Sequence, residues 1–295
     1  MPIVHLADRS LVLVSGADAE HLLQNILTTD LDKLGEDEAK PGALLTPQGK
    51  ILFDFLISRD GSGGFRLDCR ADVVDDFIRR LMLYRLRAKA EISKPDQTFV
   101  SVSWQGDSST SQDDSSELPQ GTAAVRDARF AGEPSVRRIY APIALGEPDP
   151  SLWHALRIAH GIAESGPDYA LGDAFPHDVL LDQSDGVGFT KGCYVGQEVV
   201  SRMQHRGTAR RRVLLVAADS ALSESGADIL AGDRSIGTLG SVSGTDGLAI
   251  VRIDRVKDAL DTGLPITAGG VAVSLTIPAW AKFTFPQDQT ATGDA

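Results

Sequence analysis

The stretch that decides the fold of this chain is Lys-Gly-Cys-Tyr-Val-Gly-Gln-Glu, at residues 191–198. Two glycines, Gly192 and Gly196, flank Cys193 at close spacing. Glycine accepts positive φ and close backbone approach, so the segment can fold tightly around the thiol and point backbone N–H groups at an anion. The neighbouring Lys191 favours the thiolate, which is the reactive form of cysteine. Cys193 is therefore a candidate reactive thiol; the alternative is a small buried apolar residue in a glycine turn.

Positive charge is concentrated in and after this octapeptide. From Lys191 to Arg212, six Lys and Arg residues stand against one acid, Glu198, in a chain whose formal net charge is -12. The cluster would suit an anionic ligand, or it would form a solvated strand or helix face that balances acidic neighbours. The net negative charge and the lack of an aromatic-rich RNA module argue against direct nucleic-acid binding.

The composition is that of a globular protein of two or three domains, with 295 residues of which 42% are apolar. The two cysteines, Cys69 and Cys193, lie far apart in the sequence, which excludes a disulfide scaffold and a structural zinc site. No apolar run reaches the roughly 18 residues of a membrane helix, and the N-terminus lacks a basic region followed by an apolar run. We therefore expect a cytoplasmic monomer that binds no metal and enters no membrane.

The first 208 residues alternate between strand and helix patterns. Apolar runs predict strands at 11–14 and 51–57, the second of which turns at 60–64 into a hairpin strand at 65–67. Apolar residues at helical spacing predict helices after Asp18, after Asp72 and after Pro150. Residues 105–120 are almost free of apolar side chains, which predicts an exposed excursion.

The pattern changes after Arg212. Short apolar runs at 213–217, 236–242, 248–253 and 271–277 alternate with turns rich in Gly, Asp and Ser. This pattern is typical of a small β-barrel or β-sandwich, so we place a second domain at 209–295.

The octapeptide resembles the signature of the YgfZ family, folate-binding proteins related to the T-protein, the aminomethyltransferase of the glycine cleavage system. Further pieces match the family in the same order: Ser15–Ala19 with Thr28-Thr29-Asp30, Gly49-Lys50, Tyr84-Arg85-Leu86-Arg87 with Lys89, Trp153 with Arg157 and Gly161, Phe175-Pro176, and Arg202 with Arg206-Gly207. The resemblance covers nearly the whole chain and is weakest across 105–140.

This resemblance implies an α+β body at residues 1–208, made of two intertwined ferredoxin-like halves around a folate cavity, and a C-terminal β-barrel. It implies tetrahydrofolate or a derivative as the ligand. It also implies an accessory role in the assembly or repair of iron–sulfur proteins, including tRNA-modifying enzymes, with Cys193 as the functional thiol and with iron–sulfur client or assembly proteins as partners.

The expected folate site combines an aromatic wall with positive charge. The flat pteridine would stack on Trp153, whose alternative role is that of a core anchor, and the anionic glutamate tail would suit the cationic cluster. The candidate folate-binding residues are Arg9, Trp153, Lys191, Gly192, Tyr194, Gly196, Gln197, Glu198, Arg202 and Arg206.

Two positions depart from the related families. Arg9 stands where a bacterial relative has an aromatic residue, and an arginine would stack on folate or form a salt bridge there. The T-protein hairpin carries an adjacent pair of aspartates, whereas this chain reads Phe53-Asp54. Asp54 therefore remains the one candidate acid/base carboxylate, or else a structurally hydrogen-bonded one. The alternative function, a folate-dependent aminomethyltransferase-like enzyme, is accordingly the less expected one.

The residues leave several roles open for Cys193. It would act as a redox thiol, as a transient cluster ligand or as a one-carbon acceptor. Because iron–sulfur centres usually take about four cysteines, cluster ligation would need a partner that supplies the other ligands. A Cys–His hydrolase or transferase, using His177 or His205, is a third class of function and requires the two side chains within hydrogen-bond reach.

Overall fold

A continuous sheet of nine strands forms the first part of the chain in this computed structural model, which describes residues 1–105, 118–130, 132 and 134–286. The strand order is β1-β7-β9-β8-β3-β4-β5-β2-β6. The strands are β1 (Ile3–His5), β2 (Arg9–Ser15), β3 (Glu38–Leu45), β4 (Ile51–Arg59), β5 (Phe65–Arg70), β6 (Glu91–Ser93), β7 (Phe99–Gln105), β8 (Ala123–Asp127) and β9 (Ser135–Ala141). Most of the excursion predicted at 105–120 falls on residues 106–117, which lie outside the described residues.

Two antiparallel halves meet in this sheet at one parallel pair. Strand β3 runs parallel to β8, with Glu38 opposite Arg126 and Ala39 opposite Asp127. The halves are intertwined, because β1 pairs with β7 of the second half, whereas β2 pairs with β5 and β6 of the first. The predicted α+β body is confirmed.

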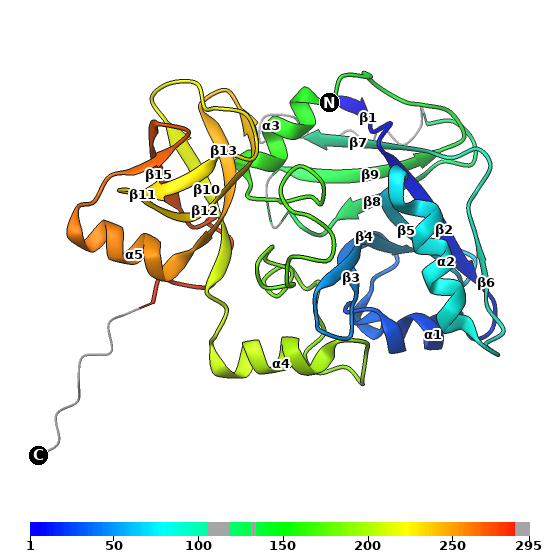
Figure 1. Cartoon of the computed structure of the whole chain (residues 1–295). Coiled ribbons are helices and arrows are strands. Elements are labelled where there is room, and N and C mark those ends of the chain that lie inside the picture. Colours follow the sequence, from blue (N-terminus) through cyan, green and yellow to red (C-terminus); the bar gives the residue numbers. More distant parts are fainter. Residues whose placement is uncertain (106–117, 131, 133, 287–295) are drawn as a thin grey trace, which may run out of the picture.

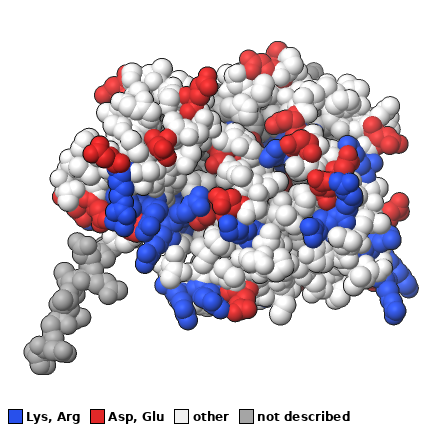
Figure 2. All heavy atoms as spheres, viewed as in Figure 1, with Lys and Arg blue, Asp and Glu red and all other residues white. Residues whose placement is uncertain are grey.

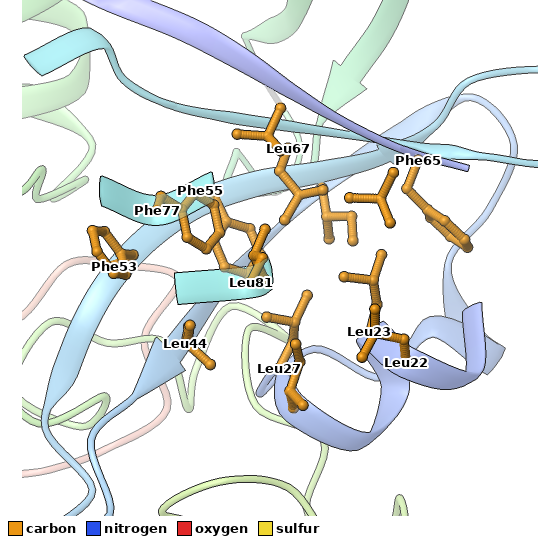
Figure 3. Close-up of a cluster of buried hydrophobic side chains, with 14 of the residues drawn as sticks. Leu22, Leu23, Leu27, Leu44, Phe53, Phe55, Phe65, Leu67, Phe77 and Leu81 are labelled. Carbon is orange, nitrogen blue, oxygen red and sulfur yellow. The ribbon is translucent and has the colours of Figure 1, made fainter. Parts of the chain in front are cut away.

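Helices α1 (Ala19–Ile26) and α2 (Val74–Arg85) pack on the first half of the sheet (Figure 1). The spacing of Leu22, Leu23 and Ile26 gives α1 one apolar face, and all three side chains are buried. Figure 3 shows side chains of both helices meeting those of the sheet, with Phe77 from α2 close to Phe53 and Phe55 from β4. Short 3₁₀ turns at Leu31–Lys33 and Ala71–Val73 follow α1 and precede α2.

Strand β4 separates this core from the interior of the body. Successive side chains of a strand point to opposite faces, so Phe53 and Ile57 join the helix-covered core while Asp54 and Leu56 face the other way. Phe53 thus places an aromatic ring in the core, and Asp54 lies on the second face of β4.

Helix α3 (Ser151–Ala159) connects the body to the barrel, because it packs against strands β12 and β13. Six strands close the barrel in the order β10-β13-β12-β11-β14-β15, which confirms the predicted C-terminal β-barrel. Their bounds are β10 (Arg211–Ala218), β11 (Asp228–Ala231), β12 (Arg234–Ser243), β13 (Asp246–Arg252), β14 (Ile266–Ala268) and β15 (Val271–Thr276). Helix α4 (Gln197–Arg206) precedes β10, and helix α5 (Ile253–Thr262) lies between β13 and β14; neither helix was predicted (Figure 1). None of the helices in the described ranges is both long and apolar enough to cross a membrane.

Candidate functional site

The octapeptide forms an exposed loop that leads into helix α4. The Cys193 side chain is exposed, and a Cβ added to the preceding residue, Gly192, would meet no atom within 4 Å. Gly196 has φ of 79° and begins the helix, and a Cβ there would lie 2.5 Å from the carbonyl oxygen of Thr46. The second glycine is therefore required by backbone geometry and by contact with the β3–β4 turn, whereas the position of the first has room for a side chain.

Two buried side chains hold this loop against the body. The Nζ of Lys191 donates hydrogen bonds to the carbonyl oxygens of Leu27, at 2.7 Å, and Thr29, at 2.8 Å. Burial lowers the pKa of Lys191 to about 8, and the acids Asp30 and Asp32 oppose this shift. The Tyr194 ring is buried, with its centroid 5.4 Å from the same Nζ. Lys191 and Tyr194 are therefore anchors of the loop.

Helix α4 carries the remaining polar residues of the motif on the molecular surface. Arg202 donates to Glu198 at 2.7 Å, one helical turn away, and both side chains are more than half exposed. Gln197 is half-buried at the start of the helix and Arg206 is exposed at its end. Figure 2 shows Lys and Arg side chains over α4 and beside α5. Arg212, the last cation of the cluster, is buried and paired with Asp182 at 2.6 Å.

A separate cavity lies inside the body, on the face of β4 that carries Asp54. The Asp54 carboxylate accepts hydrogen bonds from the Ser165 hydroxyl, at 2.5 Å, and from the Tyr169 hydroxyl, at 2.9 Å. Burial, together with the nearby Asp54 carboxylate, raises the pKa of Tyr169 well above its ordinary value, so this phenol stays protonated and donates. Trp280, from the segment after the barrel, also lines the cavity, and its Nε1 donates to the His160 carbonyl at 2.7 Å.

A buried group of arginines and acids forms the other wall. Arg9 donates from Nε to the Asp68 carboxylate at 2.7 Å and from Nη2 to the Asp68 carbonyl at 2.6 Å. Burial by itself would raise the pKa of Glu164, but surrounding arginines overcome this and lower it to about 2. These arginines are Arg157, Arg129, Arg9 and Arg138. Among the described residues, Glu164 Oε1 has no hydrogen-bond partner, although Arg129 and Arg138 lie 3.6 and 3.8 Å away.

Trp153 lies in the core beneath this charged group. Its exposed fraction is 1%, and the Arg138 guanidinium covers its ring at 4.9 Å from the centroid. Trp153 is not among the residues that line the cavity, whereas Arg9 and Asp54 are. A cation on the face of a buried indole is a stable arrangement, which gives Trp153 a structural role in this conformation.

The structure therefore divides the predicted site residues between two places. Arg9 and Asp54 line the inner cavity, while the octapeptide and α4 form the exposed loop and surface helix and contribute no side chain to the cavity lining. His177 is fully buried with Nε2 on Gln204 at 3.2 Å, and His205 is on α4. Within the described ranges, no group of three or more His, Cys, Asp or Glu side chains is arranged to hold a metal ion.

The inner cavity is small in this conformation. Its volume is about 40 Å³, which accommodates a few water molecules at roughly 10–15 Å³ each and not a pteridine. A wider groove of about 340 Å³ adjoins it and shares Arg9 and Glu164 with it. A ligand as large as a pteridine therefore requires the cavity to widen.

Sequence reasoning missed several of the cavity residues. They are Arg129, Glu164, Ser165, Tyr169 and Trp280. None of them stands in a local motif, because they come from loops and from the segment after the last barrel strand. Tyr169 and Trp280 had the one available signal, since both are aromatic residues outside the strand pattern.

Comparison with known proteins agrees with this architecture. Residues 210–283 match the family model of the CAF17 C-terminal beta-barrel domain. The solved structure of the glycine cleavage system aminomethyltransferase T from Bartonella henselae aligns with a TM-score of 0.73 and 15% identity, over 95% of this chain and 86% of that one. At this identity the likeness concerns the fold alone.

Curated relatives extend over most of the sequence. The iron-sulfur cluster assembly factor IBA57, mitochondrial, of Mus musculus is 28% identical over 93% of this chain and 84% of its own length, and the Homo sapiens protein is 29% identical over the same shares. The IBA57 homolog of Neurospora crassa is 30% identical over 72% of this chain, and the chain spans about half of its length, 52%.

The names of these relatives overturn one expectation from the sequence. A cytoplasmic location was expected because the N-terminus lacks a basic region followed by an apolar run, and this expectation is wrong against the comparison, since the relatives are mitochondrial proteins. A pattern that recognises secretory signals does not report on this compartment. The chain is thus similar, over nearly its whole length, to mitochondrial iron-sulfur cluster assembly factors, and it has the fold of aminomethyltransferase T.

Proposed function

We propose that this protein supports the assembly or repair of iron–sulfur proteins and that Cys193 is its functional thiol. The observation that carries the proposal is the exposed thiol in a loop that Lys191 and Tyr194 hold firmly against the body. A thiol held out in this way is open to a second protein. The similarity to iron-sulfur cluster assembly factors supports the same role.

The geometry favours cluster ligation shared with a partner over one-carbon acceptance by the thiol. The second cysteine, Cys69, is fully buried, so Cys193 would supply one ligand and the partner would supply the rest. The thiol loses its proton to solvent and the thiolate binds a cluster iron, which leaves the oxidation state of the sulfur unchanged. One-carbon acceptance from a ligand in the cavity receives no support, because the octapeptide does not line the cavity.

The inner cavity is our proposed site for a reduced folate. A pterin ring presents N–H donors, and the carboxylates of Asp54 and Glu164 are acceptors on the cavity wall. Glu164 Oε1, which has no hydrogen-bond partner in the described residues, supports this assignment. Binding requires the cavity to open from its present volume, and Arg9, tied to Asp68, lies between the cavity and the adjoining groove.

The thiol proposal is tested by complementation of a host that lacks this protein. Cys193→Ser should reduce the activity of an iron–sulfur dehydratase and of an iron–sulfur tRNA-modifying enzyme to the level of the empty vector. Gln197→Ala, in the same motif, is the matched control and should retain full support. Full support by Cys193→Ser at equal protein level would overturn the proposal.

The folate proposal is tested separately by calorimetric titration with tetrahydrofolate. Asp54→Asn should weaken binding at least about tenfold, since it removes a charged acceptor worth about 1.5–3 kcal/mol. Asp149→Asn, at an exposed carboxylate outside the cavity, is the control. Absence of binding by the unaltered protein at sub-millimolar concentration would remove the folate part and leave the thiol part standing.

A further inference from the structure

The C-terminal end of helix α2 exposes apolar side chains to solvent. The exposed fractions are 40% for Met82, 67% for Leu83 and 84% for Leu86. Met82 and Leu83 lie in the last turn of α2, and Leu86 is the residue that ends the helix. The opposite face of α2 is already used, because Phe77 and Leu81 are buried in the core (Figure 3). This apolar patch, Met82, Leu83 and Leu86, is therefore left without a partner in the described part of the chain.

The segment that contains the apolar patch is rich in positive charge. Residues 79–91 carry five cations and one acid, Glu91, although the whole chain has a net charge of -12. Among the described residues, Arg80, Arg87 and Lys89 form no ion pair, and the Asp18 carboxylate near them accepts the backbone N–H of Lys89. The remaining cations are Arg79, which pairs with Asp76, and Arg85, which donates to the Ala90 carbonyl at 3.4 Å.

The backbone of the patch is strained at its most exposed residue. Leu86 ends α2 with φ of 45° and ψ of -105°, a conformation that favours glycine. The Leu86 side chain is not buried in the core and its backbone is strained, so a leucine at this position does not stabilise the fold of the chain by itself. Glycine at this position would end the helix with less strain.

We propose that the end of α2 is a docking surface for a second protein whose matching surface is an apolar cleft rimmed by Asp and Glu. Burial of Leu83 and Leu86 would supply the attraction, and the unpaired Arg80, Arg87 and Lys89 would select an acidic rim. This inference goes beyond the proposed function and does not depend on the chemistry of Cys193, which lies in the loop before α4 and not on α2.

The observations favour an acidic protein over an anionic membrane. The patch is limited to three side chains at a helix end, whereas helices that lie in a membrane surface expose a long apolar face. The net charge of -12 also opposes approach to an extended anionic surface, while a small complementary interface responds mainly to charges within a Debye length of about 8–10 Å.

Photo-crosslinking in cells that express the full chain tests the inference. A photoreactive amino acid replaces Leu83 in one experiment and Leu260 in the other, because Leu260 is similarly exposed, at 52%, on α5 beside Asp258 and Asp261. We expect an adduct of Leu83, absent at Leu260, with a peptide of another protein that contains clustered Asp and Glu. The purified partner should then bind the unaltered chain, with affinity falling at least tenfold between 50 and 500 mM salt.

A second variant separates docking from folding. Leu86→Gly removes the exposed side chain and relieves the positive φ, so its midpoint of thermal unfolding should equal or exceed that of the unaltered protein, while binding of the purified partner falls at least tenfold. The inference is overturned by adduct yields at Leu83 no higher than at Leu260, by adducts only with lipid or with a second copy of this chain, or by partner binding that Leu86→Gly and salt leave unchanged.

Discussion

The two cysteines should react with an alkylating reagent at very different rates in the native protein. Burial raises the pKa of Cys69 to about 12. At pH 7.5 a thiol with this pKa is about 3 × 10⁻⁵ ionised, so almost none of Cys69 is present as the reactive thiolate. Cys69 is also 0% exposed, so the reagent must wait for local opening, and the rate ratio should exceed about 10³.

Isotope-coded iodoacetamide, added in pulses at pH 7.5 and quantified by peptide mass spectrometry, measures both rates in one sample. Unfolding the chain in guanidinium is the control, and there the two rates should agree within about threefold. Native rates within tenfold of each other would refute the assignment of Cys193 as the exposed functional thiol and of Cys69 as a core residue. Cys193→Ala should change the free energy of unfolding by no more than about 0.5 kcal/mol, which is the range of surface substitutions.

Three further outcomes are expected. The folded-state pKa of Glu164, about 2, is below the ordinary 4.5, so the carboxylate contributes up to about 3 kcal/mol of stability above pH 4.5, and this contribution is lost as the pH falls toward 2. Glu164→Gln should therefore make the free energy of unfolding less dependent on pH in this range, as measured by urea unfolding between pH 2.5 and 6. Gly196→Ala should destabilise the protein by about 1–3 kcal/mol, because residue 196 has a positive φ and the added Cβ meets the Thr46 carbonyl. Gly192→Ala should change the free energy of unfolding by less than about 0.5 kcal/mol, and equal free energies of unfolding for the two variants would contradict the loop geometry. In a glycine-cleavage assay with purified carrier protein and tetrahydrofolate, the chain should not replace T-protein, since Phe53 takes the place of one aspartate and faces the core, and turnover above about 1 s⁻¹ would favour the aminomethyltransferase alternative.

Elements with a complete local pattern could be predicted from the sequence. The apolar spacing of α1 and the apolar run of β4 each specify one buried face, and the structure has both within a few residues of the expected bounds. Helix α5 was missed because Ile253 closes the apolar run of β13, so the spacing of Val256 and Ala259 after it was not recognised as a helix. The cause is physical, because Ile253 belongs both to the strand pattern of β13 and to the helix pattern of α5, and these patterns have different periods.

The site was harder to predict because nearness in sequence does not decide which way a side chain points. Lys191 belongs to a cationic run, yet it is buried on two carbonyl oxygens, while Arg212 is paired with Asp182, and Arg202 is on the surface. The carboxylate of Asp54 meets Ser165 and Tyr169 only because a distant loop crosses β4. Contacts of this kind depend on tertiary packing and leave no periodic signal.

The exchange of strands between the two halves determines the order in which strands can pair while the chain is synthesised. Strand β1 pairs with β7, and the partner of Ile3 is Ser103, which is synthesised a hundred residues later. At the usual 5–20 residues per second, the ribosome needs about 5–20 s to supply that partner. Strand β2 receives β5 and β6 earlier, so the first half can close while β1 still projects as an unpaired edge with Val4 exposed. During those seconds the unpaired edge of β1 is open to pairing with other chains, and a chaperone that covers this strand would protect it.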